Sequence, residues 1–209
     1  MANNKNIKVV IGVPVSDTDA MRALTAQAIG GAIIGAHKEG VDVIDMVLRR
    51  SCDIVSNRTW LVNYALNTDA THLLMVDADM IFPADTIPKL LAHKKPVVGV
   101  KYKKREFPVK WLYKRSEVIE GATEPTDTPF VVEYVGTGLM LIDLSIIKDL
   151  GKPKNEGERP TAWFSFGRDS QGALVMGEDV WFCNVVRDAG HQVWVDPTIN
   201  IGHVGEYIY

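Results

Sequence analysis

Apolar residues form short runs along the first half of the chain, separated by polar segments. Four runs are β-branched or continuously apolar, which is typical of buried strands. Three intervening segments carry apolar residues at helical spacing. The predicted strands are Lys8–Val15, Val41–Leu48, His72–Val76 and Pro96–Val100, and the predicted helices are Ala20–His37, Asn57–Leu66 and Pro83–Ala92.

Cap-forming residues stand where these helices should begin. Asp17, Thr18 or Asp19 is the candidate cap of the first helix, and Ser56 that of the second. Pro83 opens the third helix. Strands that alternate with helices predict an α/β fold with a largely parallel sheet.

The second half of the chain predicts shorter strands, partly antiparallel, followed by a long loop, a helix and a last strand. We find no repeat and no linker, so residues 1–209 are expected to form a single domain. The expected elements are strands at Val109–Tyr113, Val131–Tyr134 and Gly138–Ile142, a loop at Gly151–Gly172, a helix at Gly177–Ala189 and a strand at His191–Val195.

Composition adds few constraints. The chain has 209 residues, of which 46% are apolar and 23% charged, and its net charge of −3 implies no global attraction to nucleic acid or membrane. Cys52 and Cys183 are expected to be buried free thiols in a reducing compartment. With no secretory signal and no apolar run of membrane-spanning length, the protein is expected to be soluble and cytoplasmic.

The most informative segment is His72–Pro83, where an apolar run leads into Asp77-Ala78-Asp79. Residues i and i+2 of a strand share one face, so both carboxylates are expected to project together past the strand end. Two hard oxygen ligands suit a divalent cation held on a phosphate-bearing ligand. A solvated turn with two acids is the alternative.

Other features suggest a site at the same edge of the sheet. Ligands of open α/β sheets bind beyond the carboxyl ends of the strands, where Pro14-Val15-Ser16 and Lys101 are also predicted to lie. Neither a Gly-x-Gly-x-x-Gly turn nor a P-loop is present, so a nucleotide would depend more on a metal. A phosphatase with an Asp-x-Asp nucleophile competes, but this motif follows the third strand rather than the first.

Four further residues have both a structural and a functional interpretation. Glu178 and Asp179 begin an apolar helix. There they either stabilise the helix through its dipole or supply a carboxylate that acts as a base. His203 lies between glycines that permit a tight backbone path toward a site, yet a lone histidine is more often packed or on the surface. Arg58 begins an apolar helix and either reaches solvent or contacts an anionic ligand.

The basic segment Lys101–Arg115 holds seven basic residues and one acid. It is a solvated face or a contact for diphosphate or nucleic acid. Together with Trp163, Phe164 and Phe166, it is the only indication of an acceptor. Aromatic faces stack on sugars and on bases, so they do not discriminate. We expect a glycan or small hydroxylated acceptor, with modified phage-type DNA as the less favoured option.

In their order along the chain, these segments resemble a known family. They are the first strand with Pro14, NRTWLVNYAL, THLLMVDADMIF, VVGVKYKK, VGTGLMLID, GEDVWFCNVVRDAGHQVWVDP and GHVG. This order is similar to that of compact, family-2-like GT-A glycosyltransferases of bacteria and bacteriophages, over about Ile7 to Gly205. The resemblance implies a single GT-A domain, which is Rossmann-like, with a mostly parallel sheet and a small antiparallel portion.

The resemblance also implies a nucleoside-diphosphate-sugar donor and Mn²⁺ or Mg²⁺ on its diphosphate. Asp77 would lie near the ribose and would ligate the metal together with Asp79 and His203. Asp179, beside Glu178, would be the base of an inverting, hexosyltransferase-like reaction. The residues expected to bind the nucleotide sugar are Pro14, Ser16, Arg58, Asp77, Ala78, Lys101, Gly136 and Gly138.

The leading hypothesis is therefore a metal-dependent glycosyltransferase. The chain is short for that family, which leaves Gly151–Gly172 as the region for acceptor recognition. Because of this short length, a non-catalytic module that binds nucleotide sugars or carbohydrate is the second hypothesis. A metal-dependent phosphatase is the third.

Overall fold

The computed structural model describes residues 7–17, 20–103, 111–116, 125–151 and 162–205. Strands and helices alternate in the first half, and short strands dominate the second. In chain order the elements are β1 Lys8–Val15, α1 Ala23–Lys38, β2 Asp42–Arg50, α2 Ile54–Leu66, β3 His72–Val76, β4 Met80–Ile81, α3 Thr86–Ala92, β5 Val97–Val100, β6 Tyr113–Arg115, β7 Phe130–Val135, β8 Leu139–Asp143, the 3₁₀ helix η1 Leu144–Asp149, β9 Gly167–Arg168, β10 Leu174–Met176, α4 Glu178–Asp188, β11 Val193–Asp196 and β12 Gly202–His203.

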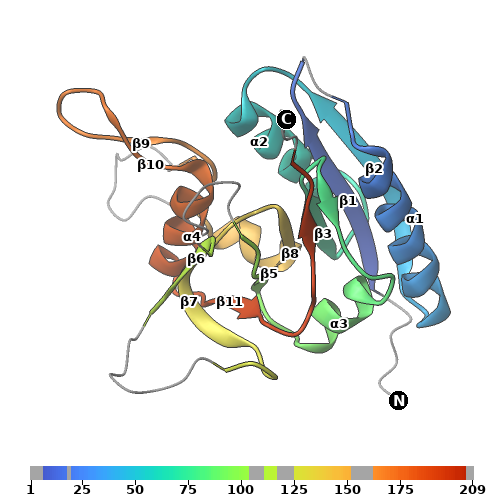
Figure 1. The fold of residues 1–209 in the computed structure, drawn as a ribbon. Coiled ribbons are helices and arrows are strands. Elements are labelled where there is room, and N and C mark those ends of the chain that lie inside the picture. Colours follow the sequence, from blue (N-terminus) through green and yellow to red (C-terminus); the bar gives the residue numbers. More distant parts are fainter. Residues whose placement is uncertain (1–6, 18–19, 104–110, 117–124, 152–161, 206–209) are drawn as a thin grey trace.

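Eight strands form one sheet in the order β2-β1-β3-β8-β5-β11-β7-β6, which runs across Figure 1 from β2 on the right to β6 on the left. The pairings make β2, β1, β3, β5, β11 and β6 run one way, while β8 and β7 run the other way. Each of the two reversed strands makes antiparallel pairs on both sides. All antiparallel pairs of this sheet therefore involve β8 or β7.

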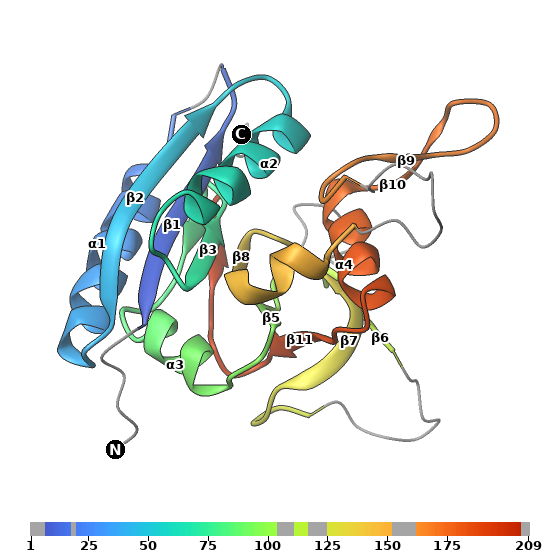
Figure 2. The same ribbon diagram turned by 180° about the vertical axis from the view of Figure 1, so that it is seen from behind.

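Helices cover both faces of this sheet. One apolar cluster packs α2, η1 and α4 on the side seen in Figure 2, and a second packs α1 and α3 on the other side. β3 shows how the sequence feeds both clusters, since Leu73 and Met75 join the first and Leu74 and Val76 join the second. A strand buried on both faces needs such a continuous apolar run, because successive side chains point to opposite faces.

Two small sheets lie outside the main one. β10 pairs antiparallel with β9, and β12 pairs antiparallel with β4, placing His203 opposite Met80. The second pairing brings the end of the described chain beside the segment that follows β3. Residues more than a hundred positions apart thus share one edge of the molecule.

The predicted elements of the first half are confirmed, with ends shifted by a few residues. β1 and β3 have the predicted bounds. The helix predicted from Pro83 begins at Thr86, because the Pro83 carbonyl instead accepts hydrogen bonds from the backbone and hydroxyl of Thr86. An α/β fold with a large mixed sheet is thus the observed architecture.

Both predictions of helix caps need correction. Asp53 caps α2 by accepting a hydrogen bond from Val55 N, so Ser56 lies inside the helix. Arg22 precedes α1 with no side-chain cap, and its N–H donates to Ala78 O at 2.8 Å. Thr18 and Asp19 lie outside the described residues.

The second half differs more from expectation. The predicted strand Val109–Tyr113 begins outside the described residues, and the regular strand there is β6. The β9–β10 hairpin was missed, because its first strand lies in the segment predicted as a loop. The strand predicted as the last is β11, but β12 follows it. β9, β10 and β12 have two or three residues each, too few to show a period of two.

The cysteine prediction was half wrong. Both cysteines are free thiols, but Cys52 is exposed while Cys183 is buried in α4. Cys52 lies in the polar turn between β2 and α2, where the chain is at the surface. Among the helices of the described residues, none is long and apolar enough to cross a membrane.

A buried carboxylate closes the end of β11. Asp196 is fully buried and accepts hydrogen bonds from His93 Nε2 at 2.6 Å, Thr198 N at 2.6 Å and Thr198 Oγ1 at 2.7 Å. Burial alone would raise the pKa of Asp196, but the hydrogen bonds from His93 and Thr198 outweigh it and hold the pKa below its usual range. The ionised form is therefore the one that the fold stabilises.

We predict that Asp196→Asn lowers the free energy of unfolding by about 1–3 kcal/mol near neutral pH, since its partners lose a charged acceptor. A carboxyl whose pKa is lower when folded stabilises the protein above its unfolded value of about 4, and loses that contribution as the pH falls below it. Urea unfolding at several pH values should therefore show the two proteins converging in acid. Asp127→Asn, at an exposed position, is the control, and an equal loss at every pH would contradict the prediction.

Candidate functional site

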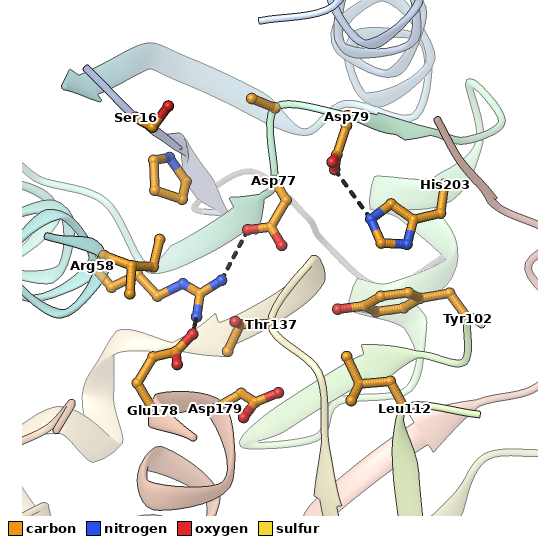
Figure 3. A pocket seen from close by; sticks show the side chains of 13 residues that line it. Ser16, Arg58, Asp77, Asp79, Tyr102, Leu112, Thr137, Glu178, Asp179 and His203 are labelled. Carbon is orange, nitrogen blue, oxygen red and sulfur yellow. Dashed lines mark hydrogen bonds and ion pairs between the residues drawn. The ribbon is translucent and has the colours of Figure 1, made fainter. Parts of the chain in front are cut away.

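A cavity of about 440 Å³ opens beyond the ends of β1 and β3. Its lining comes from segments spread over the whole chain (Figure 3). The lining residues are Pro14, Ser16, Ile54, Arg58, Asp77, Ala78, Asp79, Tyr102, Leu112, Thr137, Glu178, Asp179 and His203.

Most of the residues predicted for the site lie in this lining. Pro14 and Ser16 come from the end of β1, and Arg58 from the second turn of α2. Glu178 and Asp179 open α4. The structure thus brings the predicted carboxylates, the arginine and the histidine into one cavity.

Arg58 lies at the centre of this arrangement. The residue is 4% exposed, and its guanidinium forms ion pairs with Asp77, at 2.9 Å, and with Glu178 (Figure 3). Burial lowers the pKa of Arg58, but the charges of Asp77 and Glu178 more than offset this, so the net pKa is raised. Arg58 therefore stays charged and ties α2 to the end of β3 and to the start of α4.

Asp77, Ala78 and Asp79 form a turn rather than an extended strand end. Met80 N donates to Asp77 O at 3.3 Å across it. Both carboxylates line the cavity as predicted, but the turn aims them at different partners, Asp77 at Arg58 and Asp79 at His203 (Figure 3). Both carboxylates therefore lie in one cavity, but the extended strand geometry predicted for them is wrong.

His203 reaches the cavity from β12. Its Nε2 lies 3.5 Å from Asp79 Oδ1, and Val204 N donates to Asp79 O at 2.8 Å. On its other side the ring makes a hydrogen bond of 3.2 Å from Nδ1 to Lys103 O. A carbonyl only accepts, so Nδ1 carries the proton and Nε2 faces the carboxylate. A backbone carbonyl on the second ring nitrogen is the usual arrangement of a metal-binding histidine.

The donor set fits a cation that is shared with a ligand. Among the residues that the structure describes, no group of three or more His, Cys, Asp or Glu is arranged to hold a metal ion. Asp79 and His203 face each other, whereas Asp77 Oδ1 is engaged by Arg58. Divalent cations at phosphate sites commonly take one or two protein ligands and complete their shell with phosphate oxygens and water. An Asp79–His203 pair suits that kind of site.

Asp179 is a half-buried carboxylate in the first turn of α4. Its Oδ1 accepts a hydrogen bond of 2.7 Å from Val180 N. Burial raises the pKa of Asp179, the charge of Glu178 adds to the rise, and the Val180 N–H and Arg58 offset part of it. A carboxylate with a raised pKa is a stronger base once ionised, which suits the acceptance of a proton from a hydroxyl group.

Four lining residues were not predicted individually: Ile54, Tyr102, Leu112 and Thr137. Tyr102 is the second residue after β5, so its place beyond the carboxyl end of a parallel strand was available as a signal. Leu112 and Thr137 offered no such signal, because they border short strands whose ends are hard to predict. Ile54 is the first residue of α2.

Three residues predicted for the site do not line the cavity: Lys101, Gly136 and Gly138. Lys101 extends over the ring of Trp111, with Nζ 5.0 Å from the ring centroid. The Tyr102 hydroxyl occupies the space beside the two glycines. A Cβ at Gly138 would lie 2.6 Å from it. Only Thr137, between the two glycines, reaches the cavity.

The basic segment Lys101–Arg115 is described only at its two ends, residues 101–103 and 111–115. Lys103 Nζ lies 5.3 Å from the Trp111 ring, and Lys114 forms an ion pair of 2.8 Å with Glu133. The three aromatic residues considered for acceptor binding differ in burial. Phe164 is buried and stacks on Phe182, so it belongs to the core, while Trp163 and Phe166 are half-buried.

Comparison with known proteins gives a likeness in fold. No protein-family model and no curated protein matches the sequence. A crystal structure of A197 from STIV matches with a TM-score of 0.57 at 13% identity, covering 96% of this chain and 87% of that one.

Two glycosyltransferase structures match as well. A mutant Drosophila β1,4-galactosyltransferase 7, in complex with manganese, UDP-Gal and xylobiose, has a TM-score of 0.51 at 14% identity over 96% of this chain and 71% of that one. GalNAc-T7 with UDP, GalNAc and Mn²⁺ has a TM-score of 0.52 at 12% identity over 96% of this chain and 44% of that one. The predicted α/β fold of GT-A type is confirmed, and these identities show the fold alone.

We predict that Arg58→Met lowers the free energy of unfolding by about 3–5 kcal/mol, because it leaves the Asp77 and Glu178 carboxylates facing each other without their cation. Chemical denaturation followed by circular dichroism measures the change. Arg168→Met, on the exposed part of the β9–β10 hairpin, should stay within about 0.5 kcal/mol of wild type. A similar small loss in both variants would mean that the ion pairs of Arg58 contribute little.

Proposed function

We propose that this protein is a metal-dependent glycosyltransferase that moves a sugar from a nucleoside diphosphate to a hydroxyl group of an acceptor. One observation carries the proposal. A single cavity combines the Asp79–His203 pair on one side, the Asp179 carboxylate across from it, and the Arg58 guanidinium between the remaining acids (Figure 3). Such groups can pair with a diphosphate, hold a cation and accept a proton.

The fold comparison supports the donor class. The galactosyltransferase structure is a complex with manganese and UDP-Gal, and the GalNAc-T7 structure contains UDP and Mn²⁺. The sequence contains neither a Gly-x-Gly-x-x-Gly nor a P-loop motif, so we assign the neutralisation of phosphate charge to side chains and a cation. We therefore assign the donor to the nucleoside-diphosphate sugars.

Asp79 and His203 would hold a divalent cation, Mn²⁺ or Mg²⁺, together with donor phosphate oxygens. A bound cation supplies neutralisation of the charge that develops on the departing diphosphate. An imidazole nitrogen beside a carboxylate favours Mn²⁺ over Mg²⁺, which prefers all-oxygen shells. Asp77 orients Arg58, and Pro14, Ser16 and Ala78 provide the wall for the nucleoside.

Asp179 would act as the base. The acceptor oxygen forms a bond to the anomeric carbon of the sugar, the bond from that carbon to the diphosphate oxygen breaks, and the hydroxyl proton passes to Asp179. Glu178 is held by Arg58, so it positions the start of α4 rather than taking the proton. Attack on the face opposite the leaving group inverts the anomeric configuration, which NMR of the first product detects.

The acceptor is proposed to be a glycan or a small hydroxylated molecule. The galactosyltransferase structure is a complex that also contains the disaccharide xylobiose, which supports a glycan acceptor here. Modified DNA remains the less favoured option from the sequence, and a mobility-shift assay over a salt series tests it.

We predict that His203→Ala weakens Mn²⁺-dependent binding of a UDP-sugar by about 1.4 kcal/mol or more, which is a factor of ten in Kd, while the fold is retained. Calorimetric titration of nucleoside diphosphates and their sugars, with and without Mn²⁺, measures it. His37→Ala, at the exposed end of α1, is the matched control. Failure of the wild type to bind any nucleoside diphosphate in Mn²⁺ would overturn the proposed function, and unchanged binding by His203→Ala would make the imidazole structural.

We predict that Asp179→Asn abolishes transfer and donor hydrolysis but leaves donor affinity unchanged, because the amide cannot accept the proton. In the wild type, kcat/KM should fall as the pH drops through the pKa of Asp179, which burial raises, so the acid limb lies above the usual aspartate value of about 4.

Asp188→Asn, at the other end of α4, should retain activity. A wild type that binds donor but neither hydrolyses nor transfers it, across many acceptors, would instead favour the non-catalytic binding module.

A further inference from the structure

Tyr102 is a buried aromatic residue whose ring lies beside the His203 imidazole. It is 4% exposed and lines the cavity, with its hydroxyl directed toward the Thr137 side (Figure 3). Its ring packs edge-on against the His203 imidazole, with centroids 5.5 Å apart and planes at 89°. This is a favourable aromatic geometry that restricts where the imidazole can lie.

The hydroxyl end of Tyr102 is fixed by the turn between β7 and β8. Gly138 N donates to the hydroxyl at 3.0 Å. The oxygen occupies the space that a Cβ would take at Gly136 or Gly138, 2.6 Å away for Gly138. Only glycines at both positions allow this approach, so the Gly-Thr-Gly turn forms a socket for the tyrosine.

The same socket is connected to the acidic turn. Gly138 O accepts a hydrogen bond of 2.9 Å from Asp77 N. On the other side, Lys103, the residue after Tyr102, accepts a hydrogen bond of 3.2 Å from His203 Nδ1 on its carbonyl oxygen. Two consecutive residues thus hold one imidazole, the first by its ring and the second by its carbonyl.

We propose that Tyr102 is a positioning residue that orients the His203 imidazole beside the Asp77–Asp79 turn, with the Gly136–Gly138 turn as its anchor. This deepens the proposed function and rests on it only for the ligand that His203 helps to bind. Tyr102 acts through His203 and Asp77, and the burial of its hydroxyl, together with the Asp77 charge, raises its pKa and keeps it neutral.

The test uses two readouts, one of which needs no metal. The His203 ring signals in the NMR spectrum are identified by their loss in His203→Gln, since the chain has five histidines. Tyr102→Leu removes the ring and should shift these signals, whereas Tyr102→Phe keeps the ring and should leave them near their wild-type positions. Affinity for UDP in Mn²⁺ should fall about 10–100-fold in Tyr102→Leu, as for other residues that orient a metal ligand.

Tyr64→Leu is the control, because it removes a tyrosine whose hydroxyl bonds Asp45 away from the cavity. It should change neither readout. Loss of the tyrosine ring current by itself shifts the His203 signals, so the affinity decides for this variant. If Tyr102→Leu folds and leaves the Mn²⁺-UDP affinity unchanged, the inference is wrong.

Gly138→Ala decides the matter if Tyr102→Leu does not fold. Its methyl group displaces the Tyr102 hydroxyl while the tyrosine remains, so the His203 signals should move, and unchanged signals would overturn the inference. Shifted signals in a protein whose wild type binds no UDP in Mn²⁺ would support the positioning role and contradict the proposed function. The two failures are therefore distinguishable.

Discussion

The buried guanidinium of Arg58 is the constraint on which the site depends. A charge removed from water must be paired, and Arg58 is paired twice, with Asp77 and with Glu178. These partners belong to the end of β3 and the start of α4, which are a hundred residues apart in sequence. The ion pairs therefore fix the distance between the two acidic segments of the cavity, and Asp179 follows Glu178 into place.

Backbone hydrogen bonds hold the acidic turn from three sides. Asp77 N donates to Gly138 O, Arg22 N donates to Ala78 O, and Val204 N donates to Asp79 O. Three consecutive residues are thus each fixed by a different part of the chain. A turn held in this way keeps its carboxylates in place without a ligand, which reduces the cost of binding.

The sequence allowed much of the fold and many of the site residues to be predicted. β1 and β3 have the predicted bounds because continuous apolar runs leave little choice about where a buried strand begins and ends. The carboxyl ends of such strands identified Pro14, Ser16 and the Asp77–Asp79 turn as cavity residues. The β9–β10 hairpin and β12 were not found, because two or three residues carry no measurable periodicity.

By itself, the sequence determined the α/β alternation, the position of the acidic turn and the presence of acids at the start of α4, since these follow from local spacing. Only the tertiary structure decided how the residues pair. Asp77 faces Arg58 and Asp79 faces His203 because the segment after β3 is a turn and β12 returns beside β4. Gly136 and Gly138, which were expected to bind the nucleotide sugar, instead leave room for the Tyr102 hydroxyl. Such contacts join segments far apart in sequence, and local preferences contain no information about them.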